Sequence, residues 1–175
     1  KEVIDEDGWV RTGDVGSWDE RGRLRVIDRK KNLFKLAQGE YIAPEKIEMN
    51  LAKNQYISQS FVHGDSLKSW LVVLIVPNKD ELVKWASSGP LANLDYNALI
   101  KHQDVISFYK EQLLGFGKKG TNELKGFEVP KEVCILAEPF TIENDLLTPS
   151  FKVKRFEVQK RYKSELDSLL ALVKE

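Results

Sequence analysis

Residues 28–48 read DRKKNLFKLAQGEYIAPEKIE, and this stretch decides the fold that we expect for the chain. An alternating run at 24–27 precedes it and predicts a strand, and alternation over 33–37 predicts a second strand. Between them stand four charged residues, 28–31. Four consecutive charges are poorly suited to a buried crossover, so we expect an exposed joint that faces a polar ligand.

The second half of the stretch predicts a turn followed by a helix. Gly39 marks the turn, and Pro44 suits a first helical position because its φ is already helical and it has no N–H to leave unpaired. The negative charge of Glu45 favours the positive end of the same helix. A strand, a charged joint, a second strand and a helix are therefore expected in immediate succession.

The sequences of three segments resemble motifs of a known family. LFKLAQGEYIAPEKIE at 33–48 resembles the hinge motif of the adenylate-forming superfamily, which includes acyl- and aryl-CoA synthetases, luciferases and peptide-synthetase adenylation domains. It looks most like the long-chain fatty acyl-CoA synthetases of eukaryotes. GWVRTGD at 8–14 and LTPSFKVKRFEV at 147–158 match two further family motifs in the same order. The resemblance covers nearly the whole chain and implies the C-terminal portion of such an enzyme.

Composition limits the class of protein. The chain has 175 residues, of which 42% are hydrophobic and 31% charged, so it is expected to be a soluble globular protein with a core. Its 27 basic residues equal its 27 acidic ones, so no overall field favours nucleic acid or an anionic membrane. The longest apolar run, 70–77, has the length of a strand and falls well short of the ~20 residues of a membrane span.

The single cysteine and the chain ends bear on the compartment. Cys134 excludes an internal disulfide, fits a reducing compartment and is expected to be a buried strand residue and not a nucleophile. No secretory signal stands at Lys1, where the sequence is expected to begin inside a domain, and 173–175 carries no peroxisomal or ER-retention ending. We expect an intracellular, cytoplasmic protein. The parent could lie peripherally on the cytosolic face of the ER or another organelle, but no membrane association is encoded here.

The segment before the joint predicts a β-hairpin with one acid of interest. Strands are expected at 15–18 and 23–27 around a turn at 19–22. Asp14, beside Gly13, could accept two hydrogen bonds from a vicinal diol such as a ribose, whereas local physics alone favours an acid that stabilises a turn. The resemblance implies the first role, in which Asp14 binds the ribose hydroxyls of ATP.

The joint itself carries basic residues with two interpretations. Residues 29–31 could form a solvated basic cluster, with a nuclear-targeting signal as a weak variant, or bind hydroxyl and phosphate oxygens. The resemblance implies that Arg29 also contacts the ribose. It further implies that Lys31 is the pivot about which a small C-terminal domain swings between two half-reactions.

The resemblance implies three more candidate site residues, which would serve the second half-reaction. Lys35 aligns with a lysine that acts in that step in some relatives. Gly39 and Glu40 correspond to the loop that lies beside the CoA pantetheine tunnel after the swing. The helix from Pro44 is expected to serve core packing.

The middle of the chain predicts scaffold and no site. A hairpin is expected from 58–63 and 70–76, a helix after Asn78, a longer helix opened by Asp95 and running through Leu114, and a strand at 133–136. GFGKKG at 115–120 spells G-x-G-x-x-G, but it follows a helix and not a strand, so a plain loop is expected.

Neither histidine points to a metal. His63 and His102 lie far apart in the sequence, with no acid or cysteine at the spacing of metal ligands, so each is expected to be structural or solvated. We expect no metal site on this chain.

The C-terminal segment carries the remaining candidate. A turn-rich run at 140–149 leads to one long amphipathic helix, whose expected apolar stripe is Phe156, Tyr162, Leu166, Leu169 and Val173. Lys152, Lys154 and Arg155 could be a basic flank of this surface helix. The resemblance implies that Lys152 is the catalytic lysine, with Lys154 as the alternative. Phe151 departs from the family, in which many members have Gly before that lysine.

The expected architecture is α+β (mixed α/β), a small C-terminal lid domain with short β-sheets and flanking helices, preceded by a β-hairpin from a large N-terminal domain. The expected boundaries are 1–29 for the end of the large domain, 30–31 for the hinge and 32–175 for the lid.

The resemblance implies a parent enzyme that converts ATP and a fatty acid to acyl-AMP and pyrophosphate, and then acyl-AMP and CoA to acyl-CoA and AMP. ATP, CoA and Mg²⁺ would be bound mainly by the N-terminal domain, the lid's partner. That domain holds the family's phosphate loop and acyl tunnel, so this chain alone is expected to be inactive. Two alternatives stay open, namely the lid of another adenylate-forming enzyme, such as an aryl- or medium-chain acyl-CoA ligase, and a non-catalytic α/β interaction module.

Overall fold

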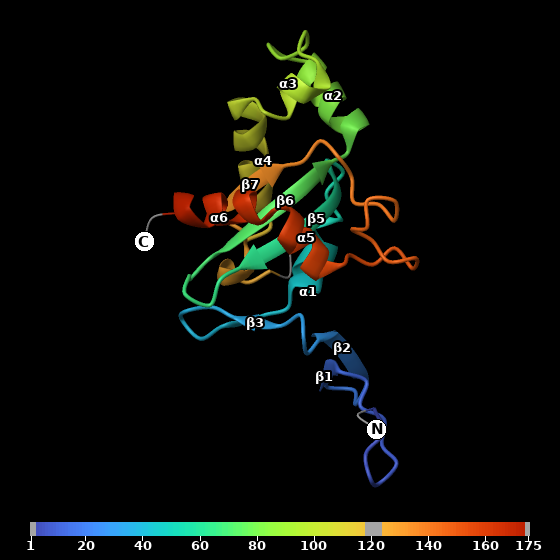
Figure 1. Ribbon diagram of the computed structural model, residues 1–175. Coiled ribbons are helices and arrows are strands. Elements are labelled where there is room, and N and C mark those ends of the chain that lie inside the picture. Colours follow the sequence, from blue (N-terminus) through green and yellow to red (C-terminus); the bar gives the residue numbers. More distant parts are fainter. Residues whose placement is uncertain (1–2, 118–123, 174–175) are drawn as a thin grey trace.

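The computed structural model describes residues 3–117 and 124–173, and it shows a hairpin that projects from a layered body (Figure 1). We call residues 3–29 the N-terminal hairpin, and 33–117 with 124–173 the layered body. Short sheets with flanking helices make up the whole, which confirms the mixed α/β class.

The N-terminal hairpin consists of β1 (Asp14–Trp18) and β2 (Leu24–Arg29), paired antiparallel with a bulge between Val15 and Gly16. Its turn forms where predicted, because Asp19 Oδ1 accepts the backbone N–H groups of Arg21 and Arg23, each at 2.9 Å. The predicted first hairpin is confirmed.

A second, very small hairpin and a helix follow the charged joint. β3 (Phe34–Lys35) pairs with β4 (Tyr41–Ile42), and α1 (Pro44–Leu51) begins at the predicted proline. The predicted strand over 33–37 is shorter than expected because the chain turns directly after Leu36, which is buried in the core.

The centre of the body is a three-stranded sheet of β5 (Ile57–Gly64), β6 (Leu71–Pro77) and β7 (Glu132–Ile135). Their order is β5–β6–β7, with β5 antiparallel and β7 parallel to β6. Every residue of β6 is buried, and its side chains alternate between two hydrophobic clusters. The predicted hairpin and the predicted third strand are both confirmed.

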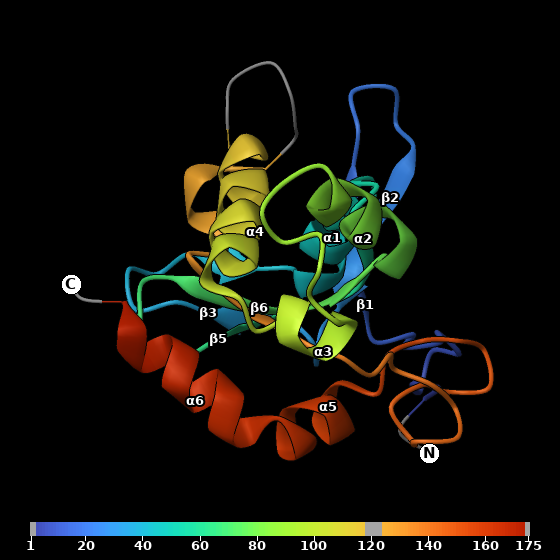
Figure 2. The ribbon, with the colours of Figure 1, turned by 90° about the horizontal axis from the view of Figure 1, so that it is seen from above.

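Helices cover both faces of this sheet (Figure 2). One face packs against α1, α2 (Lys79–Ser87), α4 (Gln103–Gly115) and the 3₁₀ turn η1 (Gly126–Glu128). The other face packs against α5 (Arg155–Arg161) and α6 (Lys163–Leu172). Helix α2 begins where predicted, but the Asn78 side chain makes no capping hydrogen bond.

The predicted long helix from Asp95 is wrong, since it is two helices, α3 (Tyr96–Leu99) and α4. Asp95 Oδ1 caps the first by accepting from Ala98 N at 3.0 Å. His102 then leaves the helical conformation and caps α4, its Nδ1 accepting from Asp104 N at 3.2 Å. Gly115 ends α4, and the part of the glycine-rich motif from 118 to 120 lies outside the described residues.

The prediction of one C-terminal helix is also wrong. Tyr162, at φ −106° and ψ 27°, separates α5 from α6. Phe156 was expected in the apolar stripe but is 73% exposed, and Val158 takes the buried place in α5. Tyr162, Leu166 and Leu169 lie in the core as predicted.

Candidate functional site

Asp14 and Arg29, the predicted ribose contacts, face each other across the N-terminal hairpin. The register of β1 and β2 sets them opposite one another, and Arg29 Nε lies 2.8 Å from Asp14 Oδ1. Arg29 Nη1 also donates to the Thr12 carbonyl at 3.1 Å. Because both side chains are partly exposed, an acceptor and a donor stand side by side and open to solvent. This is an arrangement that two neighbouring hydroxyl groups can bind.

Lys31, the predicted pivot, lies in the turn that connects the N-terminal hairpin to the layered body. Asn32 N donates to the Arg29 carbonyl at 2.9 Å, and Lys30 N donates to the Gly13 carbonyl at 2.8 Å. The Lys31 side chain is exposed. Its place between the two parts fits a pivot, and pivoting itself stays a prediction.

Asp28 is a buried acid at this joint that sequence reasoning counted only as part of a charge cluster. Its Oδ1 accepts from Arg29 N at 2.6 Å and from Asn32 Nδ2 at 3.0 Å, and its Oδ2 accepts from Glu45 N at 3.1 Å. The carboxylate therefore joins the end of β2 to the first turn of α1. An acid directly after the alternating run 24–27 was the available signal.

Lys35, Gly39 and Glu40 meet in the small β3–β4 hairpin. Leu36 N donates to the Glu40 carbonyl at 2.9 Å, and Gly39 closes the turn at φ +95°, which a residue with a side chain rarely adopts. The Lys35 ammonium lies 5.5 Å from the centre of the Tyr41 ring, a cation–π contact between cross-strand partners. The three predicted residues are all exposed.

Lys152 lies on a loop that directly precedes α5, and the loop's backbone is fixed by local hydrogen bonds. Thr148 N donates to the Lys152 carbonyl at 2.8 Å, and Lys152 N donates to Thr148 Oγ1 at 3.1 Å. The side chain is exposed, and among the described residues it makes no hydrogen bond or ion pair. Its ammonium is therefore available to an anion.

Lys154, the alternative, is already engaged, because its ammonium pairs with the Asp145 carboxylate. Arg155 is engaged as well. Its Nη1 donates to both carboxylate oxygens of Glu48 at 2.8 and 3.0 Å, and its Nη2 donates to the Val62 carbonyl at 2.6 Å. The predicted basic flank is thus one free lysine beside two paired cations. Sequence reasoning missed Glu48, because 107 residues separate it from Arg155 and no local pattern marks such a pair.

The backbone at Phe151 adopts a conformation that favours the glycine found in many members of the family. Its φ is +59°, in the left-handed region where glycine is favoured and a bulky side chain is an outlier. The side chain is 74% exposed, so no burial offsets this conformation.

The structure gathers the predicted residues at three places and not in one cluster. These are the open end of β1–β2, the joint with the β3–β4 hairpin, and the loop before α5. In the described part of the chain, no hydrogen bond or ion pair links Lys152 to the other candidates.

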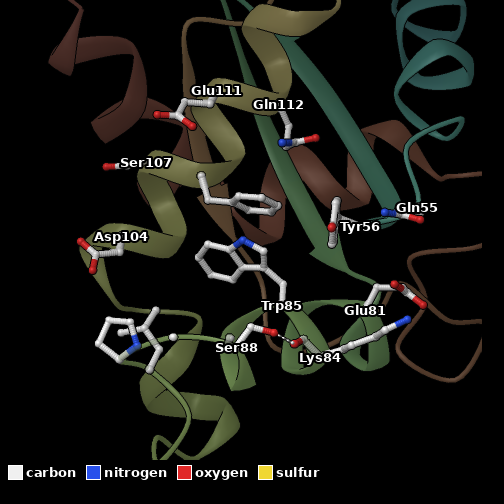
Figure 3. Close-up of a pocket in the computed structure, with 15 residues that line it drawn as sticks. Gln55, Tyr56, Glu81, Lys84, Trp85, Ser88, Asp104, Ser107, Glu111 and Gln112 are labelled. Carbon is white, nitrogen blue, oxygen red and sulfur yellow. Dashed lines mark hydrogen bonds between the residues drawn. The ribbon is translucent and has the colours of Figure 1, made fainter.

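A groove of about 850 Å³ lies away from all of these residues, between α2 and α4 (Figure 3). The Phe108 ring stacks on Trp85 with centroids 4.3 Å apart and meets Tyr56 edge-on at 4.9 Å. Figure 1 shows α2 at the opposite end of the body from β1 and β2. None of the predicted site residues lines the groove.

Two titratable side chains away from the candidate residues, His63 and Cys134, are partly buried. Burial, with Arg155 as a second cause, lowers the pKa of His63, and burial raises the pKa of the Cys134 thiol in β7. Over residues 3–117 and 124–173, no three His, Cys, Asp or Glu side chains gather where they could hold a metal. Within the same residues, none of the helices has the length and apolar character needed to cross a bilayer.

Comparison with known proteins gives sequence relatives over the whole chain. A mouse long-chain-fatty-acid–CoA ligase 5 is 46% identical over all 175 residues, which is 25% of that protein. The Arabidopsis thaliana peroxisomal long chain acyl-CoA synthetase 6 is 50% identical over 155 residues, 89% of this chain and 22% of that protein. The chain thus spans about a quarter of the length of such relatives. No family model matches.

Solved structures agree in fold. The adenylation domain of a Mycobacterium chelonae carboxylate reductase superposes with a TM-score of 0.80 at 32% identity, covering 97% of this chain and 24% of that one. The A-PCP didomain of the Segniliparus rugosus carboxylic acid reductase, in complex with AMP, gives 0.78 at the same identity, covering 97% of this chain and 22% of that one.

By fold and sequence, the chain is a homologue of the adenylate-forming enzymes, so the predicted resemblance is confirmed. Within that superfamily, its sequence relatives are the long-chain fatty acyl-CoA synthetases, which it matches along its entire length.

Proposed function

We propose that the chain is the C-terminal part of a long-chain fatty acyl-CoA synthetase. In this proposal residues 1–29 end the large domain, 30–31 are the hinge and 32–175 are the lid. The names of relatives that are 40–50% identical over nearly the whole chain support it. The parent would join a fatty acid to CoA through an acyl-adenylate, at the expense of ATP.

The observation that carries the proposal is the free ammonium of Lys152 beside two paired cations. Activating a fatty acid brings its carboxylate against a phosphate of ATP, and these two anions repel each other. A fixed cation placed where charge develops stabilises such a transition state by a few kcal/mol. Lys154 and Arg155 are held by Asp145 and Glu48, so Lys152 is the residue of this segment that can serve.

The hairpin residues are proposed to hold the nucleotide. Asp14 can accept from the ribose hydroxyl groups, and Arg29 can donate to them, because both are exposed and adjacent. ATP supplies the phosphoanhydride whose cleavage drives adenylation. Mg²⁺ is proposed to be bound by the large domain.

The joint is proposed to separate the two half-reactions. Thiol attack on the acyl-adenylate has different electrostatic needs from adenylation, and a hinged lid removes Lys152 once its work is done. In the same proposal Lys31 is the pivot, and Lys35, Gly39 and Glu40 come to the CoA side after the swing. Their common hairpin directly follows the joint.

The test uses the natural protein extended to the length of its relatives. Palmitate-dependent pyrophosphate release and acyl-CoA formation are measured for wild type, Lys152→Ala and a control, Lys160→Ala. We expect wild type to make both products, Lys152→Ala to lose about 10²–10³-fold in pyrophosphate release, and Lys160→Ala to match wild type. A Lys152→Ala protein with wild-type pyrophosphate release would refute the lysine's role. The 175-residue chain alone is expected to form no AMP.

A second candidate function is another adenylate-forming activity, favoured by the 32% identity to carboxylate reductase adenylation domains. A parent that adenylates acids but forms no acyl-CoA, or that accepts aryl acids and not palmitate, would establish it. If the parent adenylates no acid at all, the remaining alternative is a non-catalytic α/β interaction module. We also propose a cytoplasmic location, peripheral to a membrane, which cell fractionation of the parent tests.

A further inference from the structure

One ion pair, Glu48 with Arg155, binds the backbone of the edge strand β5 at Val62. β5 is one of the two edge strands of the described sheet, and the N–H and C=O groups of Val62 bond to side chains outside the sheet. Glu48 Oε1 accepts from Val62 N at 2.7 Å, and Arg155 Nη2 donates to the Val62 carbonyl at 2.6 Å. The pair thus supplies the two backbone partners that an edge strand lacks.

The pair is tightly held and mostly buried. Besides the two Nη1 contacts to the Glu48 carboxylate, the Arg155 guanidinium lies over the Phe61 ring at 4.5 Å. The two side chains are 18% and 13% exposed, for Arg155 and Glu48. A planar guanidinium with bidentate, backbone and ring contacts has one geometry, which lysine cannot reproduce.

These two residues come from opposite layers of the body. Glu48 lies on α1, which packs on one face of the sheet, and α5, which begins at Arg155, packs on the other (Figure 2). The first turn of α1 is bound to the joint by the hydrogen bond from Glu45 N to Asp28. Arg155 follows Lys152 by three positions. A continuous path of contacts therefore runs from the joint through α1 to the Lys152 loop.

The other hydrogen bonds described for residues 146–154 connect them to one another, to Thr141, Asn144 and Asp145 in the preceding run and to Val158 in α5, and none reaches α1. Arg155 thus makes the polar connection between this segment and α1. We infer that Glu48 and Arg155 are positioning residues, which lock the Lys152 loop to the helix that leaves the joint, so that Lys152 moves with the hinge as one rigid body. The inference rests on the proposed function, since it assigns the pair to adenylation.

Comparing the rates of the two half-reactions distinguishes a positioning role of the pair from a general effect on stability. Arg155→Lys and Glu48→Gln are made in the full-length parent, and two rates are measured for each. One is pyrophosphate release from ATP and palmitate, and the other is acyl-CoA formation from preformed palmitoyl-AMP. Because displacing a catalytic group by about 1 Å can cost 10²-fold, we expect adenylation kcat to fall by about 10–100-fold. We expect the second rate to stay within about twofold, because it does not use Lys152.

The matched control is Lys46→Met. Lys46 lies on the same helix and pairs with the buried Glu128 through contacts of 2.8 and 2.9 Å, but it connects α1 to η1 and not to the Lys152 loop. We expect it to lower both rates by the same factor. Equal losses in both half-reactions for Arg155→Lys, or no loss in either, would overturn the inference.

A second measurement keeps the inference testable whatever the activity or folding of the parent variants. Hydrogen exchange is compared in the 175-residue chain for Arg155→Lys and Lys46→Met. The Thr148 and Lys152 amides, both hydrogen-bonded in the loop, should exchange faster in Arg155→Lys alone. Equal exchange in the two variants overturns the inference. A parent that forms no acyl-adenylate from any fatty acid refutes the proposed function instead, and the exchange result then decides the mechanical link by itself.

Discussion

The N-terminal hairpin and the layered body differ in the exposure of their apolar side chains. In the hairpin, seven large apolar residues are more than half exposed, namely Val3, Ile4, Trp9, Val10, Trp18, Leu24 and Val26, and no apolar residue is buried. In the body, all seven residues of β6 are buried, and they contribute to clusters on both faces of the sheet. The body therefore contains its own core, whereas the hairpin has none.

A two-stranded ribbon without cover is marginally stable in water. The single buried residue of β1 and β2 is Asp28, which is polar and lies at the joint to α1. In the proposed enzyme the apolar surface of the hairpin is covered by the rest of the large domain. The contrast fits the proposed domain boundary at the joint, with a body that contains its own core on one side and a hairpin that has none on the other.

The strongest test of this contrast is Leu74→Ala in the centre of β6. Leu74 is fully buried between helices and sheet, so truncation removes its contacts and leaves a cavity. We expect the free energy of unfolding to fall by about 2–5 kcal/mol, measured by urea denaturation of the 175-residue chain. A loss below about 1 kcal/mol would mean that the body does not hold a close-packed core.

Asp28→Ala tests the joint where the two regions meet. The substitution leaves Arg29 N, Asn32 Nδ2 and Glu45 N without their buried acceptor, so we expect a loss of about 1–3 kcal/mol. Asp19→Ala is the control, because Asp19 also accepts from two backbone N–H groups but sits in the exposed hairpin turn. The same urea transition should barely change for Asp19→Ala. Equal losses for both variants would contradict the boundary at the joint.

Sequence reasoning succeeded where the deciding forces are local. Alternation and turn residues predicted the hairpins around 19–22 and 64–66, and the proline at 44 predicted the start of α1. It failed where the deciding contact is a single capping atom or a distant partner. The break at His102 depends on one imidazole nitrogen accepting from Asp104 N, which a hydrophobic period does not encode.

The candidate site divides in the same way. The proximity of Asp14 and Arg29 could be predicted from the sequence, because the register of one hairpin sets them opposite each other. The sequence could not predict that Lys152 is free and Lys154 is paired, since this depends on Asp145 reaching Lys154 from a turn-rich loop. The link between Glu48 and Arg155 is likewise a tertiary contact between two layers of the body.

Phe151→Gly tests whether the loop of the body is strained. The left-handed conformation costs a bulky residue about 1–2 kcal/mol, and the flexibility of glycine costs roughly 0.5–1 kcal/mol, so a net gain of up to about 1.5 kcal/mol is expected. Phe156→Gly is the matched control, being equally exposed but helical, and it should lose up to about 1 kcal/mol. The urea midpoints of the two variants should therefore move in opposite directions. A shift of the same sign in both would refute the strain at Phe151.

Both histidines lie in the layered body, so acid sensitivity in the histidine range should belong to the body. The pKa of His63 is lowered from its ordinary 6.5 by burial and by Arg155, so the unfolded chain takes up a proton before the folded chain does. Stability is therefore complete above pH 6.5 and falls as the pH drops from there through the lowered pKa. Urea midpoints at pH 7.5 and 5.5 should differ less in His63→Gln than in wild type. An unchanged difference would assign the loss to other groups.

Leu24→Ala is the counterpart of Leu74→Ala, the same chemical change made in the hairpin. Leu24 is 60% exposed on β2, so its truncation should change the free energy of unfolding of this chain by no more than about 0.5 kcal/mol. In the full-length parent, the proposed large domain covers this surface, and the same truncation should then cost more than it does in the isolated chain. Urea denaturation of both lengths measures the difference. An equal, small effect in both would show that the hairpin stays uncovered, and Leu24 and the exposed tryptophans of 3–29 would then need a partner other than the large domain.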